Sequence, residues 1–153
     1  MKKVFISHSS KDEETCRVVV NALIQAGVKQ EQIMCTAIPE VGIRGNDFTQ
    51  EIVNSLEQSV FNVILFSSNY YNSVNCLNEA GIIWFLHMSK KSVPMLCLAD
   101  KGFSFSEING FVNGNTCQFF RLSEKEKRHS LGALCNNVRD VLRIKKQYNL
   151  IID

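Results

Sequence analysis

A lone carboxylate stands out in the middle of the sequence. Between Glu57 and Lys90 the only formally charged side chain is Glu79. An apolar run begins directly after it, at Ala80. A carboxylate in such surroundings is poorly hydrated, so neutral hydrogen-bond donors must hold it or it must do chemistry. Glu79 is therefore the first candidate for a catalytic residue. The dipole of a helix also favours an acidic residue near its start, and this structural interpretation stays open.

Short apolar runs alternate with helical patterns along the whole chain. Strands are expected at 4–6, 33–35, 60–66, 93–98 and 116–122, and helices after Ser10, after Asp47, from about 74 to 89 and after Ser123. Units this short predict parallel crossover connections. The sequence thus predicts one α/β domain over residues 1–153: a flavodoxin-like five-stranded parallel sheet of order 2-1-3-4-5 with helices on both faces.

In such a sheet, ligands bind beyond the carboxyl ends of the strands. Glu79 lies in the first turns of the helix after the third strand, close to the expected cleft. His8, Ser9 and Ser10 form the loop after the first strand and could contact a ligand there. His8 could equally bond to the backbone, and the two serines could simply cap the next helix.

Composition and charge exclude several classes of protein. The chain has 153 residues, 45% apolar and 21% charged, and a net charge of +2 with both signs scattered. We therefore expect neither nucleic-acid binding nor a membrane span. Six cysteines without a C-x-x-C pair are interpreted as reduced core residues, and no metal site is predicted. Without a signal peptide pattern, the expected localisation is cytoplasmic.

Familiar phosphate-binding motifs do not occur at the predicted sheet edge. A phosphoacceptor response regulator needs acidic residues at the ends of strands one and three, where this chain has Ser7-His8-Ser9 and Ser67-Ser68. Neither a dinucleotide-binding G-x-G-x-x-G after the first strand nor a Walker A motif is present. The response-regulator, dinucleotide-binding and Walker A classes are therefore rejected.

Four segments together resemble the bacterial TIR (Toll/interleukin-1 receptor) domain family. They are residues 5–12, residues 34–39 with the following loop at 42–48, residues 67–73, and the run Cys76-Leu77-Asn78-Glu79-Ala80-Gly81 followed by Trp84. They occur in the family's order and cover essentially the whole chain. The family has the fold expected above.

The resemblance implies an NAD⁺ glycohydrolase, which cleaves the nicotinamide–ribose bond to give nicotinamide and ADP-ribose or a cyclic isomer of it. Glu79 occupies the position of the family's catalytic glutamate. NAD⁺ is then the substrate, and no other cofactor is expected. The family often has an aromatic residue where this chain has Asn75, which weakens the case for cyclisation more than for hydrolysis. The implied substrate contacts are His8, Ser9, Ser10, Arg44, Asn75 and Cys76.

The resemblance also implies activation by self-association, with a sensor domain, fused or separate, as a further partner. The implied role is that of an effector in prokaryotic antiphage immunity. Arg44 could meet a diphosphate or a neighbouring protomer, or could simply be solvated. The contacts would come from the family's BB loop, here Ile38, Pro39, Val41, Gly42, Ile43, Arg44 and Gly45.

Two other functions stay open. A non-catalytic TIR adaptor would act only through contacts with other TIR domains and would have no need for Glu79. A nucleoside or deoxyribose transferase-like enzyme would also place a glutamate near a ribose, but would form a covalent intermediate on it.

Overall fold

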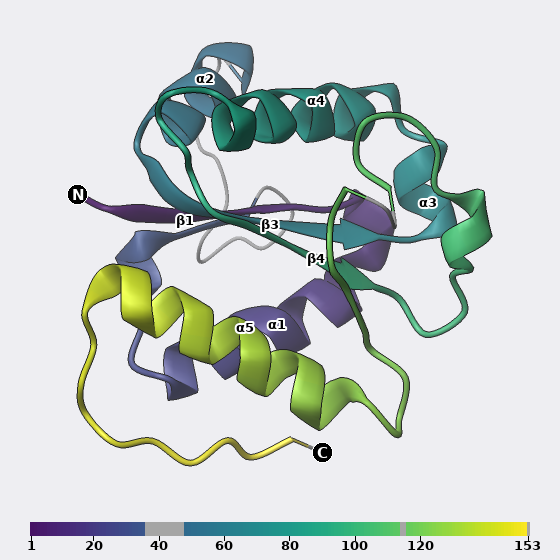
Figure 1. Ribbon diagram of the computed structural model, residues 1–153. Coiled ribbons are helices and arrows are strands. Elements are labelled where there is room, and N and C mark those ends of the chain that lie inside the picture. The colour runs from purple at the N-terminus through teal and green to yellow at the C-terminus, as the bar shows by residue number, and fades with distance from the viewer. Residues whose placement is uncertain (36–47, 114–115, 153) are drawn as a thin grey trace.

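A five-stranded parallel sheet forms the centre of the computed structural model, which describes residues 1–35, 48–113 and 116–152 (Figure 1). Its strand order is β2-β1-β3-β4-β5, which confirms the predicted 2-1-3-4-5 topology. The strands are β1 (Lys3–Ser7), β2 (Ile33–Cys35), β3 (Ser59–Phe66), β4 (Met95–Ala99) and β5 (Phe119–Arg121).

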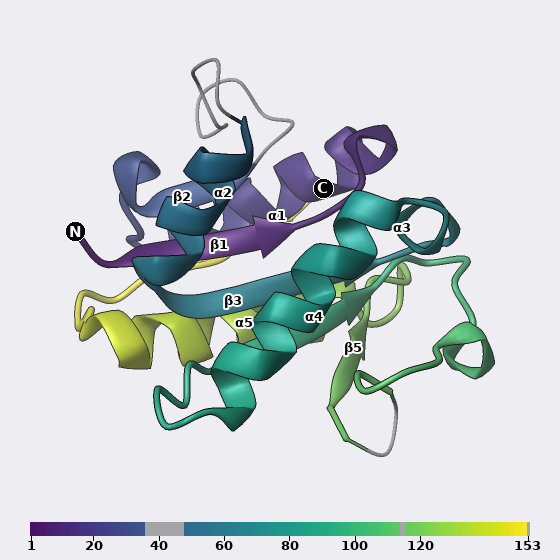
Figure 2. The same ribbon diagram turned by 90° about the horizontal axis from the view of Figure 1, so that it is seen from above.

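Helices cover both faces of this sheet, as predicted. On one face lie α1 (Glu13–Gln25) and α5 (Lys127–Leu142). On the other lie α2 (Phe48–Glu57) and α4 (Val74–Met88), with the short α3 (Ser68–Tyr71) at the carboxyl end of β3 (Figures 1 and 2). Three single turns complete the described elements: η1 (Ser10–Asp12), η2 (Gln30–Gln32) and η3 (Phe105–Glu107).

The pleat of the strands divides the core into two layers. In β1, Val4 and Ile6 pack with α1 and α5, whereas Phe5 packs with α4. This follows because successive side chains of a strand point to opposite faces. β3 is buried along almost its whole length, which explains its nearly continuous apolar sequence.

The structure corrects several element boundaries. No helix was expected between the third strand and residue 74, but Ser67 accepts a hydrogen bond from the Tyr70 backbone N–H and so begins α3. The fifth strand was expected over 116–122 and pairs only over Phe119–Arg121. β4 begins at Met95 rather than at residue 93, and Pro94 just before it has no N–H to give to a ladder. Across the described residues, no helix is both long enough and apolar enough to cross a membrane.

Candidate active site at the carboxyl ends of the strands

Glu79 points from α4 toward the end of β1 and is almost completely buried, with 7% of its surface exposed. Ser7, the last residue of β1, donates a hydrogen bond from Oγ to Glu79 Oε1 at 2.6 Å. Within the described residues, Glu79 forms no ion pair, and Oε2 has no hydrogen-bond partner. Burial raises the pKa of the Glu79 carboxyl, and the Ser7 hydrogen bond partly offsets this rise.

A buried tyrosine orients the Ser7 hydroxyl. Tyr70 OH lies 2.8 Å from Ser7 Oγ. Because Ser7 has one hydroxyl proton and gives it to Glu79, the Tyr70 hydroxyl is the donor in this contact. Tyr70 is fully buried, and burial raises its pKa well above the usual value, so it keeps its proton. The Ser7 hydroxyl, oriented by Tyr70, thus holds one oxygen of Glu79, and the other oxygen remains available to a ligand.

A second buried carboxylate ties together the loops at this edge. Asp12, at the end of η1, is 8% exposed. Its two oxygens accept hydrogen bonds from Ser67 Oγ at 2.5 Å and from Asn69 Nδ2 at 3.0 Å. The loop after β1 is therefore fixed to the loop after β3, and both flank Ser7.

The other sequence-predicted contacts are spread around this edge. Ser9 is buried and accepts a hydrogen bond from the Lys11 backbone N–H, which makes it the cap of η1. Ser10 and Asn75 are exposed. Cys76 is buried in the core beneath α4, and its backbone N–H donates to Ser73 Oγ. The expected BB-loop residues, Ile38, Pro39, Val41, Gly42, Ile43, Arg44 and Gly45, lie outside the described residues.

His8 faces away from Glu79. Its side chain is 3% exposed and lies on the α1 side of the sheet, with Nε2 2.9 Å from Cys35 Sγ. Its Nδ1 atom is buried and has no hydrogen-bond partner among the described residues. Burial lowers the pKa of His8 to about 4, and the nearby charges of Asp12 and Glu13 oppose this only in part. The imidazole is therefore neutral near neutral pH.

An apolar cavity of about 160 Å³ lies next to the site, between α4 and the segment at 109–112. Ala80, Gly81 and Trp84 form its α4 wall, with Phe66 and Tyr71 beside them. Glu79 does not line this cavity, because its side chain leaves α4 toward β1. Trp84 is partly buried, packs against the core and also borders the cavity.

Sequence reasoning missed Ser7, Asp12 and Tyr70 as parts of this site. Ser7 carried a usable signal, because it follows Phe5 by two residues and therefore faces the same side of the sheet. Asp12 and Tyr70 carried none, since their partners lie 55 and 63 residues away in the sequence.

The fold and site define a class: a three-layer α/β domain with a buried acidic residue at the carboxyl ends of its strands. A family model described as "TIR domain" matches residues 4–134. The chain belongs to the TIR domain family.

A curated relative and several solved structures are similar to the chain. Uncharacterized protein YddK of Bacillus subtilis (strain 168) is 43% identical over 133 residues, which are 81% of this chain and 48% of YddK. This chain therefore spans about half the length of that relative.

The solved structures share the fold. The crystal structure of the TIR domain of the Toll-related receptor TRR-2 from Hydra magnipapillata has a TM-score of 0.65 and 18% identity, covering 91% of this chain and 97% of that one. The TIR domains of the activated Roq1 resistosome, which directly recognises the pathogen effector XopQ, have a TM-score of 0.55 and 21% identity. That match covers 90% of this chain and 70% of that chain.

Proposed function

We propose that this domain is an NAD⁺ glycohydrolase in which Glu79 is the catalytic residue. The observation that carries the proposal is the state of the Glu79 carboxylate. It is buried at the ligand-binding edge, Ser7 holds one of its oxygens, and no cation among the described residues neutralises it. A carboxylate kept in this way costs stability, so it is suited to a positive charge that arrives from outside.

The proposed reaction needs little machinery. The bond between the nicotinamide nitrogen and ribose C1′ breaks, and its electron pair returns to the pyridinium ring, which leaves as neutral nicotinamide. No general acid is required. The ribose becomes oxocarbenium-like, and a water oxygen then bonds to C1′ and releases its proton, giving ADP-ribose. A carboxylate beside C1′ stabilises the developing positive charge and can accept hydrogen bonds from the ribose hydroxyls.

The surroundings of Glu79 fit this role. Glu79 must be ionised to act, and its raised pKa works against ionisation in the empty site. A cationic nicotinamide ribose near the carboxylate would favour the charged form again. The binding of a cationic substrate and the ionisation of Glu79 thus reinforce each other, which a neutral ligand would not achieve.

The direct test is incubation of the wild-type domain with NAD⁺ over a series of protein concentrations, with chromatography of the products. We expect free nicotinamide and ADP-ribose in equal amounts. We also expect a specific activity that rises with concentration, because the proposed active state is an assembly populated by mass action. A domain that self-associates but releases no nicotinamide at any concentration is an adaptor, and the enzymatic proposal then fails.

Ser7→Ala should shift the acid limb of the pH–rate profile to higher pH. The Ser7 hydrogen bond stabilises the ionised form of Glu79, so removing it raises the pKa of Glu79 further. Activity that depends on the carboxylate would then be lost at a higher pH as the solution is acidified. The measurement is kcat/KM for NAD⁺ against pH, which reports groups of the free enzyme.

Ser106→Ala is the control for Ser7→Ala, because Ser106 is an exposed serine of η3 and is not one of the expected substrate contacts. Its profile should coincide with that of the wild type. Identical acid limbs in Ser7→Ala and in the wild type would show that Glu79 is not the group whose ionisation the reaction needs.

The proposed setting is a cytoplasmic prokaryotic immune system in which a sensor controls assembly of the domain. The family membership and the greater length of the similar Bacillus subtilis protein support this setting. Loss of phage protection in cells that carry the Glu79→Gln substitution, at unchanged protein level, is the expected cellular result.

A further inference from the structure

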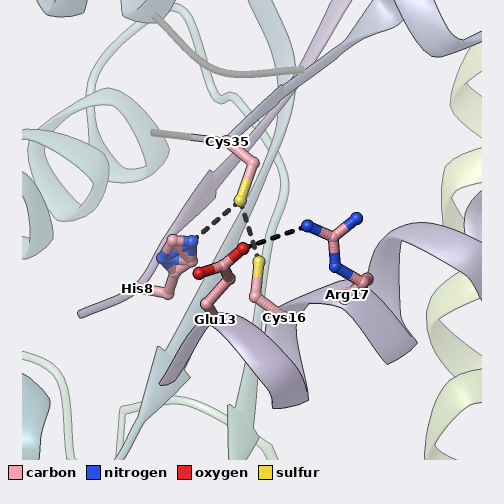
Figure 3. A network of polar contacts seen from close by, with 5 residues as sticks. All are labelled: His8, Glu13, Cys16, Arg17 and Cys35. Carbon is pink, nitrogen blue, oxygen red and sulfur yellow. Dashed lines mark hydrogen bonds and ion pairs between the residues drawn. The ribbon is translucent and has the colours of Figure 1, made fainter. Parts of the chain in front are cut away.

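Three metal-ligand side chains converge behind the proposed active site, on the opposite face of the sheet. They are His8 after β1, Cys16 in the second turn of α1 and Cys35 at the end of β2 (Figure 3). All three are buried, with 3%, 0% and 0% of their surfaces exposed. The mechanism proposed above uses none of them.

The pleat and register of the sheet explain this convergence. Ile6 of β1 pairs with Cys35 of β2, so the two side chains point to the same face. His8 follows Ile6 by two residues and turns to that face as well, toward α1. There, Cys16 is on the buried side of α1, in the same core layer as Ile6 and Cys35. The three residues are 8, 19 and 27 positions apart in sequence, so no short motif predicts their contact.

Short polar contacts join the three side chains. Cys16 Sγ lies 2.8 Å from Cys35 Sγ, and Cys35 Sγ lies 2.9 Å from His8 Nε2. The fold therefore drives three potential ligand atoms toward one point, and all of them lie within 4.8 Å of one another.

We propose that His8 Nε2, Cys16 Sγ and Cys35 Sγ form a buried binding site for a zinc ion. On binding, zinc would displace the protons of both thiols, and two thiolates with one neutral imidazole balance its double positive charge, so the loaded site can be buried without a net charge. Thiolate and imidazole are also the ligands that zinc prefers. A water molecule would take the fourth tetrahedral position.

Binding requires a small local expansion. With Zn–S bonds of about 2.3 Å and tetrahedral angles, the two sulfur atoms would stand roughly 3.8 Å apart. The Cys16 and Cys35 side chains must therefore separate by about 1 Å, which rotation about their χ1 angles supplies. The ion would then join β1, α1 and β2 immediately behind Ser7, and Cys35 is the last described residue before 36–47.

A disulfide between Cys16 and Cys35 is the competing interpretation. Its bond length would be about 2.05 Å, so the sulfur atoms would have to move closer together. The position of His8 favours zinc over a disulfide. Its Nε2 atom is directed at Cys35 Sγ, and a disulfide would offer this nitrogen only a weak partner.

The test uses the whole domain, stripped of metal with a chelator under reducing conditions and then titrated with zinc against a chromophoric competitor. We expect one equivalent of zinc to bind. Cobalt, used as a spectroscopic probe, should give thiolate-to-metal charge-transfer absorption and the intense visible bands of a tetrahedral ion. Cys16→Ser and Cys35→Ser should each weaken zinc binding by ~10-fold or more and reduce the charge-transfer band.

Two other cysteines provide matched controls. Cys135→Ser changes a thiol that is equally buried but lies on α5, and Cys117→Ser changes the partly exposed thiol that is hydrogen-bonded to Cys97. Both should bind zinc and cobalt like the wild type. If Cys16→Ser or Cys35→Ser does not fold, His8→Asn serves as the test variant. We expect the same loss of zinc affinity from it.

Three results would overturn the inference. The first is a wild-type domain that binds no zinc, and the second is zinc binding that survives in every cluster variant. The third is a disulfide in the protein as purified, seen as a mass lower by two hydrogens and as a cross-linked Cys16–Cys35 peptide. None of these results depends on NAD⁺ cleavage. The zinc site can therefore be disproved while the proposed activity stands, and the activity can be disproved while the zinc site stands.

Discussion

Glu79→Gln should lower the rate of nicotinamide release by about 100-fold to 1,000-fold while the domain stays folded. The amide oxygen of glutamine can still accept the hydrogen bond from Ser7, so the local geometry is kept. Only the negative charge is lost, and it is this charge that would stabilise the cationic ribose. The measurement is nicotinamide released per mole of protein, at protein concentrations matched for assembly.

The same substitution should raise the melting temperature at pH values above the folded-state pKa of Glu79. Burial raises the pKa of Glu79 in the folded protein, so the native state binds this proton more tightly than the unfolded chain does. The stability that this proton contributes is present below the unfolded pKa and is lost as pH rises through the folded pKa. Glutamine carries no charge to desolvate, so the variant should not lose this stability as the pH rises.

A more stable but inactive variant would be hard to explain if Glu79 were only structural. Glu57→Gln is the control, because Glu57 ends α2 and is exposed. It should change neither the rate nor the dependence of melting temperature on pH. If Glu79→Gln keeps the wild-type rate at matched assembly, the acidic residue is not catalytic and the domain is better explained as a docking module.

The fold was predictable because its signals are local and repeated. Five apolar runs alternating with amphipathic helices allow few topologies, and the observed strand order is the predicted one. The errors fall where tertiary contacts outweigh local pattern. Ser67 both caps α3 and donates a hydrogen bond to Asp12. Neither bond could be predicted from the sequence, because the polar residues after β3 have the composition of a loop.

The candidate site was predictable only in part. Glu79 stood out because no other charge lies near it in sequence, and the structure finds it buried. Its orienting partners, Ser7 and Tyr70, come from two other elements, so no spacing rule joins them. The convergence of His8 with Cys16 and Cys35 escaped for the same reason, because it depends on strand register and on the packing of α1.

Asp12→Ala should destabilise the domain by about 2–4 kcal/mol, the largest loss expected from any single polar side chain discussed. The carboxylate accepts two hydrogen bonds, from Ser67 and Asn69, and a bond to a charged group contributes about 1.5–3 kcal/mol. Alanine would leave the Ser67 hydroxyl, itself 2% exposed, without its acceptor. Urea unfolding should show a lower midpoint with an unchanged slope.

Two further variants separate the buried hydrogen bonds from charge alone. Asp12→Asn keeps one acceptor oxygen and should lose clearly less stability than Asp12→Ala. Glu13→Ala removes the neighbouring carboxylate, which is exposed and pairs with Arg17 at 3.0 Å within α1, and should cost no more than about 0.5 kcal/mol. Equal losses in Asp12→Ala and Glu13→Ala would mean that Asp12 does not tie the two loops together. The loops beside Ser7 would then need another support, and the Oε2 atom of Glu79 would be less firmly positioned than the geometry indicates.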